Sequence, residues 1–266
     1  RALRRAMRAR AFVPRTNPGF DFTRQELGTR LSFPLTSRTR LQGGADLSRM
    51  DRSDRAVEQA DELTLWSSLR WRLLDASALS LRVERSYRRG DDYSVVPQIE
   101  PPQNPLMRKY SMADQDRFSL QVTANHPLTD RLTLGAQFRT DRVDYPDTRI
   151  GLTDTDENAL SLDITYARDG NWSASLFTGF NHFDSRQQGS ATFAAPDWAA
   201  QIEDTAISVG GALDWHPVDS RWETGVEFSL VDGQSDISVS DTPFPEVGAD
   251  LVRLVYRGSY RFNDTL

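Results

Sequence analysis

The strongest constraint on the fold is a regular alternation of apolar and polar residues from residue 131 to residue 262. The clearest apolar series are Leu132, Leu134, Ala136 and Phe138, and further on Leu160, Leu162, Ile164 and Tyr166. Alternation with a period of two places each series on one face of a β-strand. Because short turns and long polar loops connect these segments in turn, the pattern is typical of an outer-membrane β-barrel.

Composition agrees with this interpretation and excludes several others. The chain has 266 residues, of which 38% are hydrophobic and 26% charged, with a net charge of −6. No segment approaches the roughly 18 apolar residues of a membrane-spanning helix, but a barrel needs apolar residues only on its lipid-facing side. The acidic balance argues against nucleic-acid binding. The chain has no cysteine, which excludes disulfides, thiolate metal sites, thiol nucleophiles and C-x-x-C-H haem attachment within it.

The predicted fold is all-β: an antiparallel up-and-down transmembrane β-barrel, here an incomplete segment of about eleven strands. The predicted strands are 25–34, 40–50, 62–74, 78–88, 117–127, 131–144, 157–168, 172–185, 204–216, 221–235 and 250–262. Short turns are predicted at 35–39, 75–77, 128–130, 169–171, 218–220 and 263–265, and long loops at 51–61, 89–116, 145–156, 186–203 and 236–249. Residues 1–266 are expected to form part of one barrel domain whose N-terminal and C-terminal strands are missing, and the basic segment 1–10 is equally compatible with a strand remnant and a disordered end.

A repeated turn and a set of aromatic residues support the barrel. The sequence HPLTDRL at 126–132 recurs as HPVDSRW at 216–222, so the repeating unit is a strand–turn–strand hairpin. Aromatic residues gather where strands meet the short turns: Phe33, Trp71, Tyr166, Trp172, Trp215, Trp222, Tyr260 and Phe262. We interpret them as the aromatic girdle of the periplasmic interface. Packing in the core of a soluble β-sandwich would not explain why they favour one end of so many strands.

The alternation assigns the two faces of each strand. The residues expected to face lipid are Leu132, Leu134, Phe138, Leu160, Leu162, Ile164, Ile207, Val209, Leu213, Val226, Phe228 and Leu254. The opposite face carries charges, including Arg82 and Glu84, which would be costly in a dry core and so must line water or a polar partner. The candidate partner-contact residues in this lumen are Arg70, Arg72, Arg139, Asp163, Asp214, Glu223, Glu227, Arg253 and Arg257.

Other site chemistry finds little support in the sequence. The histidines His126, His182 and His216 are expected to be structural rather than metal or haem ligands. Glycines 210 and 211 precede no helix, which argues against a phosphate loop. Residues 154, 156 and 157 are acidic but lack the spacing of an EF-hand, so calcium binding there is a minor alternative. No serine has a recognisable nucleophile context. We therefore predict no catalytic, cofactor or metal residues and no enzyme activity.

Four loop motifs, in order, carry a family resemblance. They are NPLMRKYSMADQDR at 104–117, DYPD at 144–147 with GLT at 151–153, the stretch from GS at 189–190 to APDW at 195–198, and PFPE at 243–246. Together they resemble the MtrB/PioB family of decahaem-associated outer-membrane β-barrels. Some members carry a C-x-x-C motif near their start, which this sequence lacks.

The resemblance implies a porin-like sheath in the bacterial outer membrane. Such a barrel holds a periplasm-facing multihaem c-type cytochrome across the membrane for extracellular electron transfer, in either direction, and an extracellular multihaem cytochrome is a further expected partner. Haem would belong to the partner, because this chain has no cofactor site of its own. The alternatives are a diffusion porin or a nutrient-transporter barrel, and, less favoured, an outer-membrane enzyme.

Overall fold

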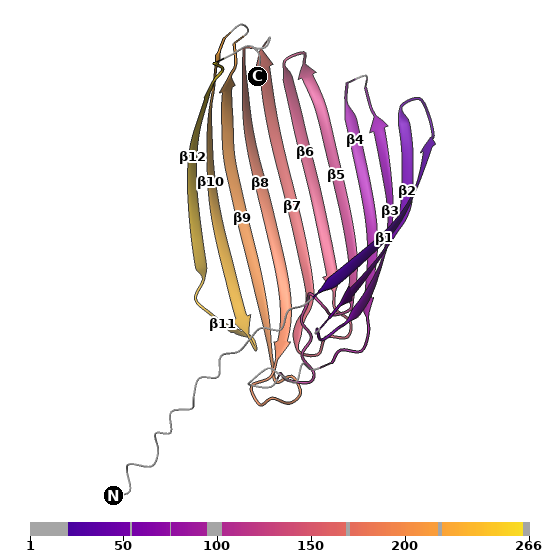
Figure 1. Cartoon of the computed structure of the whole chain (residues 1–266). Helices are drawn as coiled ribbons and strands as arrows, with labels where there is room; N and C mark the ends of the chain where they lie inside the picture. The colour runs from indigo at the N-terminus through magenta and orange to yellow at the C-terminus, as the bar shows by residue number, and fades with distance from the viewer. Residues whose placement is uncertain are drawn as a thin grey trace, which may run out of the picture.

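The computed structural model describes residues 21–53, 55–74, 76–94, 103–168, 171–217 and 220–262. These residues form one antiparallel sheet of 12 strands, drawn in Figure 1. The strands are β1 (Phe22–Pro34), β2 (Thr39–Arg52), β3 (Gln59–Arg72), β4 (Ala78–Gly90), β5 (Gln115–Thr129), β6 (Leu132–Asp144), β7 (Gly151–Arg168), β8 (Trp172–Gly189), β9 (Trp198–Trp215), β10 (Trp222–Val239), β11 (Thr242–Pro243) and β12 (Val247–Tyr260). Within the described ranges, no helix is long and apolar enough to cross a membrane.

The topology is the predicted meander. Each strand from β1 to β10 pairs antiparallel with its neighbours in sequence, and β12 pairs with β10. The two-residue strand β11 was not predicted, and it pairs with the end of β10. The sheet is open, with β1 and β12 at its two edges (Figure 1). The segment 1–10 and parts of the predicted turns, at 75, 169–170, 218–219 and 263–265, lie outside the described residues.

The strands extend further than predicted at the end where the long loops lie, which we call the loop end; the opposite end is the turn end. The predicted loop 145–156 is shortened because β7 already begins at Gly151, and the predicted loop 186–203 is shortened by β8 and β9. β10 likewise continues to Val239. The prediction failed there because the outward positions of these strand extensions are mostly polar, so the apolar series of that face stops while backbone pairing continues.

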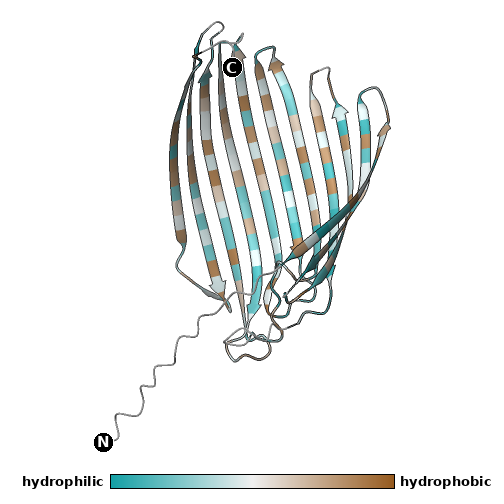
Figure 2. Ribbon diagram, in the orientation of Figure 1, coloured by the Kyte–Doolittle hydropathy of each residue, from teal (hydrophilic) through white to brown (hydrophobic). Residues whose placement is uncertain are grey.

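The pairing register confirms the assignment of faces. Directly paired residues share a face, and one such row contains Phe138, Leu160, Phe180 and Ile207. Following every ladder in this way places all the residues that were expected to face lipid on one side, the apolar face. The alternating brown and teal segments along the strands in Figure 2 show the same pattern. The other side is the polar face.

The apolar band on this face is slightly shorter than the lipid-facing band typical of outer-membrane barrels. On β9 it runs from Trp215 to Ile207, a separation of about 27 Å along a strand that rises about 3.4 Å per residue. With the tilt of about 35–45° that barrel strands have, this span corresponds to a height of about 20 Å, compared with about 25 Å for a typical lipid-facing band. The predicted aromatic residues on the strands all lie on the apolar face at the turn end, which is the arrangement that a membrane-interface girdle requires. Trp222 and Tyr260 stack there with ring centroids 4.7 Å apart.

The buried apolar core lies at the loop end instead of between layers. Ala113, Val143 and Tyr145 form a buried cluster against which Leu152 packs. Val143 belongs to the polar face of β6, so the loop before β5 folds over the end of that face. The guanidinium group of Arg88 holds this loop by donating hydrogen bonds to the backbone oxygens of Ala113 at 2.8 Å and of Tyr110 at 2.6 Å.

The register predicts opposite responses to a charge on the two faces. Leu162→Arg should lower the free energy of unfolding by about 2–4 kcal/mol, because it places a cation at mid-depth in lipid. Ser161→Arg, on the neighbouring polar-face position, is the matched control and should cost far less. Denaturant unfolding of the barrel in phospholipid vesicles measures both, and equal losses would contradict the register.

Candidate functional site

The candidate site is the polar face of the sheet. All the residues predicted as lumen contacts lie on it: Arg70 and Arg72 on β3, Arg139 on β6, Asp163 on β7, Asp214 on β9, Glu223 and Glu227 on β10, and Arg253 and Arg257 on β12. They are spread over most of the sheet and do not converge on one centre. This face therefore offers dispersed charge to a large surface.

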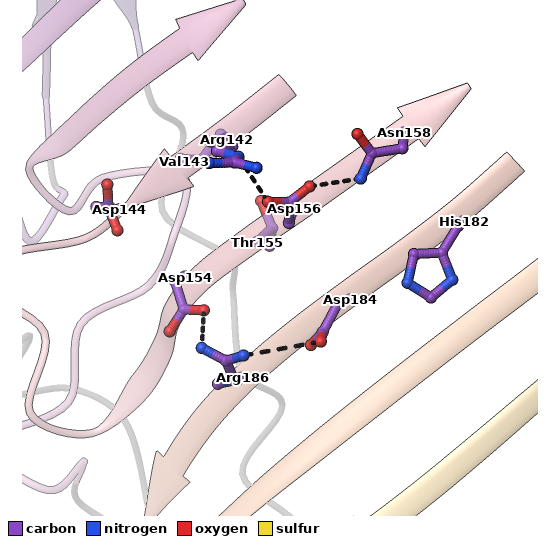
Figure 3. Close-up of a pocket in the computed structure, with 10 residues that line it drawn as sticks. All are labelled: Arg142, Val143, Asp144, Asp154, Thr155, Asp156, Asn158, His182, Asp184 and Arg186. Atoms are coloured by element: carbon purple, nitrogen blue, oxygen red, sulfur yellow. Dashed lines mark hydrogen bonds and ion pairs between the residues drawn. The ribbon is translucent and has the colours of Figure 1, made fainter. Parts of the chain in front are cut away.

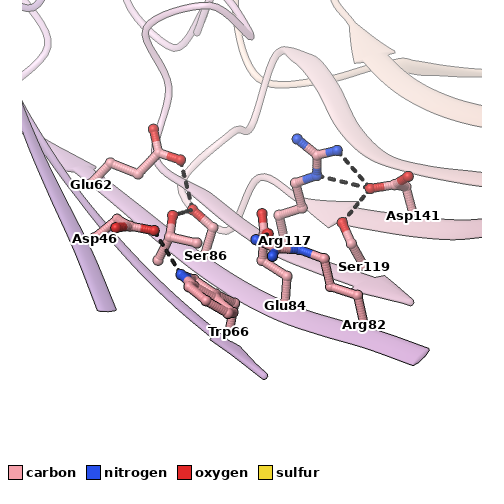
Figure 4. Close-up of polar contacts among 10 residues, drawn as sticks. Asp46, Glu62, Trp66, Arg82, Glu84, Ser86, Arg117, Ser119 and Asp141 are labelled. Atoms are coloured by element: carbon pink, nitrogen blue, oxygen red, sulfur yellow. Dashed lines mark hydrogen bonds and ion pairs between the residues drawn. The ribbon is translucent and has the colours of Figure 1, made fainter. Parts of the chain in front are cut away.

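Asp141 is the centre of the most buried charge network on this face (Figure 4). Its side chain is only 6% exposed and accepts a hydrogen bond from Arg117 Nη2 at 2.6 Å. Ser119 and Arg139 also donate to its two carboxylate oxygens. These partners come from β5 and β6, so the network fixes Arg139, one of the predicted contact residues, against the wall.

Trp66 forms a second cluster, on the polar face of β3. Its Nε1 donates to Asp46 Oδ2 at 2.9 Å, and the guanidinium carbon of Arg82 lies 4.6 Å from the ring centroid, within cation–π range. Gly44 on β2 makes room for the ring, since a Cβ there would lie 2.7 Å from its atoms. Arg82 also pairs with Glu84 at 2.8 Å. The indole is thus held as a packed part of a charged wall (Figure 4).

The charges on β9, β10 and β12 form a third group. Glu227 Oε1 lies 3.4 Å from Arg253 Nη1, and Glu227 Oε2 lies 3.5 Å from Arg257 Nη2. The same Arg257 nitrogen is 4.0 Å from Asp214 Oδ1. Glu223 pairs with Arg261 at 3.6 Å. In this part of the wall, acidic and basic side chains largely neutralise one another.

The acidic residues proposed as a minor calcium site do not lie in a loop and do not come together. They lie on β7, where successive side chains point to opposite faces, so Glu157 is on the polar face while Asp154 and Asp156 are on the other. Asp156 pairs with Arg142 at 2.8 Å, and Asp154 pairs with Arg186 at 3.3 Å, as Figure 3 shows. In the described part of the chain, no group of three or more His, Cys, Asp or Glu side chains could hold a metal ion.

The histidines are separate in space and have local partners. His126, the first residue of the repeated turn sequence, lies within β5, and its Nδ1 is 2.6 Å from Ser77 Oγ. His182 on β8 has its Nδ1 3.3 Å from Thr205 Oγ1 on β9. The backbone nitrogen of His216, just after β9, donates to the carbonyl of Asn171 at 2.9 Å.

The sequence did not point to Asp46, Trp66, Arg117 or Asp141. An aromatic residue at a polar position of the alternation was the one available signal for Trp66. The partners of Asp141 are 22 and 24 residues away for Ser119 and Arg117. Only the strand register brings such residues together, and a one-residue error in register would separate them.

Comparison with known proteins agrees with this architecture. Residues 6–266 match the family model of the outer membrane beta-barrel porin MtrB/PioB. The chain is 28% identical over 228 residues to outer membrane protein MtrB of Shewanella baltica strain OS185. This match covers 84% of the chain and 32% of the relative, so the chain spans about a third of that protein's length.

Solved structures show the same fold at low identity. The ferric-catecholate import receptor Fiu of E. coli K12, in its open form, matches with a TM-score of 0.63 at 11% identity, over 94% of this chain and 53% of the receptor. The ferric yersiniabactin uptake receptor FyuA of Yersinia pestis matches with a TM-score of 0.59 at 15% identity, over 92% of this chain and 44% of the receptor.

The Asp141 network predicts a localised stability effect. Asp141→Asn removes the buried negative charge that holds Arg117 and Arg139, and loss of one partner of a buried ion pair destabilises a folded protein by about 3–5 kcal/mol. We expect the lower part of this range, because both guanidinium groups are partly exposed. Asp163→Asn, at an exposed position of the same face, is the control and should change stability little. Denaturant unfolding in vesicles measures the free energy of unfolding of both variants. Equal losses would show that the Asp141 network contributes no more to stability than an exposed carboxylate.

Proposed function

Because the chain belongs to the MtrB/PioB family of outer-membrane β-barrel porins, we propose that its barrel is a sheath that holds a multihaem c-type cytochrome across the outer membrane for extracellular electron transfer. The protein resides in the outer membrane, where the apolar face of its sheet contacts lipid and its polar face lines the lumen. The cytochrome partner and the electron transfer are the proposal.

The curvature of the sheet supports a wide lumen. Nearly the whole chain superimposes on about half of a large receptor barrel. Barrel diameter grows with strand number, and the 22-stranded transporters of the outer membrane enclose a plug within their lumen. A barrel continued with this curvature has room for a folded protein.

The observation that carries the proposal is the charge on the lumen wall. Acidic and basic side chains are dispersed over β3, β6, β7, β9, β10 and β12 and are not gathered at one constriction. Dispersed charge of both signs suits the orientation of a protein surface, because it fixes register and excludes wrong partners. A small diffusing solute needs no such extended set of contacts.

Membrane energetics explains why the partner needs a sheath. A cytochrome with ionised groups cannot cross about 30 Å of hydrocarbon unaided, since each buried charge is costly there. The polar lumen supplies a water-like environment, while the outward side chains and the paired backbone satisfy the lipid. The sequence has no cysteine and therefore no C-x-x-C-H motif, so the partner must supply the haems. The role of this chain is to bind and position, with no catalytic step of its own.

Gentle purification of the complete natural protein from its own membrane tests this function. We expect a haem-containing protein to migrate with the barrel, and vesicles that carry the complex to pass electrons from an external reductant to an enclosed dye. Vesicles with the barrel alone are the control. A barrel that purifies without haem and conducts ions as an open pore would establish the diffusion-porin alternative instead.

A further inference from the structure

A group of arginine residues lies on the polar face at the turn end of β2 and β3. Arg38, Arg40, Arg70 and Arg72 line a depression of about 390 Å³, together with Pro34 and uncharged hydroxyl residues of the adjoining turn. Among the described residues that line this depression, none is acidic. We call Arg40, Arg70 and Arg72 the arginine cluster.

The centre of the cluster is an unfavourable pair. Arg40 and Arg70 lie directly opposite each other on the polar face of β2 and β3. Like charges in this arrangement destabilise a sheet, because their side chains emerge about 5 Å apart. Arg72 donates a hydrogen bond to the backbone oxygen of Ser37 at 2.8 Å, a partner without a charge. Neither Arg40 nor Arg70 forms an ion pair with any described residue.

Most other arginines of the lumen wall differ in this respect. Arg82 and Arg139 pair with Glu84 and Asp141, and Arg253 and Arg257 face Glu227. At these positions, a carboxylate of the same sheet neutralises the charge of the arginine. Arg40 and Arg70 have no such carboxylate partner among the described residues.

The surrounding wall is also asymmetric in charge. Gln42 on β2 and Arg139 on β6 belong to one row of directly paired residues across the sheet. From this row to the turn end, the charged polar-face residues described on β2 to β6 are all arginines: Arg40, Arg70, Arg72, Arg82 and Arg139. On β7 to β10 the corresponding charges are all carboxylates: Asp163, Asp214, Glu223 and Glu227. Because Arg253 and Arg257 on β12 offset the carboxylates of β9 and β10, the basic charge of Arg40 and Arg70 is the clearer excess at the turn end.

We propose that the arginine cluster is the docking site for a carboxylate-rich patch on the protein in the lumen. This inference rests on the proposed function and adds the chemistry of the contact: the partner turns an acidic surface toward β2 and β3. Planar guanidinium groups bind carboxylates in bidentate fashion, and two or more such pairs fix an orientation as well as a position. The partner's carboxylates then offset the repulsion between Arg40 and Arg70 that the barrel leaves uncompensated.

The test uses the complete natural protein with its cytochrome, in wild-type form and as the double variant Arg40→Gln, Arg70→Gln. The matched control is Arg142→Gln, Arg186→Gln, which removes the same charge from the outward face at the loop end. The haem protein retained on the immobilised barrel is measured against salt concentration. We expect the dissociation constant of the cluster variant to rise at least about tenfold, with a weaker salt dependence, while the control stays near wild type.

Two further readouts separate the possible failures. The partner-free cluster variant should unfold at the wild-type temperature or slightly above it, because glutamine relieves the like-charge pair; this excludes misfolding as the cause of lost binding. Equal haem retention by the variant and the wild type would overturn the docking site and leave the sheath function standing. A wild-type barrel that carries no haem, together with an anion selectivity that the variant loses, would overturn both and identify the cluster as a filter for small anions.

Discussion

The structure depends on one constraint: in hydrocarbon, backbone polar groups have no partner except each other. A sheet meets it by pairing every N–H and C=O between strands, and antiparallel neighbours achieve this with short connections. Pairing in turn commits alternate side chains to opposite faces, so a row such as Phe138, Leu160 and Phe180 must be apolar throughout. The same geometry forces every intervening residue onto the lumen wall. The charged wall is thus the necessary other side of the lipid-facing band.

This link between strand pairing and the two faces of the sheet explains why the sequence predicts the fold well but the site only in part. Alternation over eight or more residues identifies a strand and its faces, and residues such as Leu162 and Val209 follow directly. The loop-end extensions were missed because Asp154 and Asp156 occupy outward positions above the lipid, where nothing selects for apolar side chains. Strand pairing there continues through backbone hydrogen bonds and cross-strand ion pairs, which leave no trace in a hydropathy pattern.

For the lumen wall, the sequence predicts which side chains of a single strand face inward, but not which side chains of neighbouring strands meet. Arg139 and Asp141 are two residues apart on β6, so alternation places both on one face. The link from Asp141 to Arg117 depends instead on which residues of β5 and β6 stand opposite each other. The same holds for the opposed pair of Arg40 and Arg70, which come from strands joined by a short turn and become neighbours only in the correct register. The sequence therefore shows which charged residues lie on the wall, whereas the register determines which charges on neighbouring strands neutralise each other.

Stability and recognition consequently occupy different ends of the same sheet. The buried cluster of Ala113, Val143 and Tyr145 and the carboxylate of Asp141 hold the loop end, where charges are paired and side chains are packed. At the turn end of β2 and β3, Arg40 and Arg70 form no ion pair with another described residue, and the wall is hollowed. An exposed like-charge pair contributes nothing to folding, so its repulsion is tolerable only where the cost is small or where a ligand offsets it. Binding at that end should therefore stabilise the barrel, in addition to orienting what lies within it.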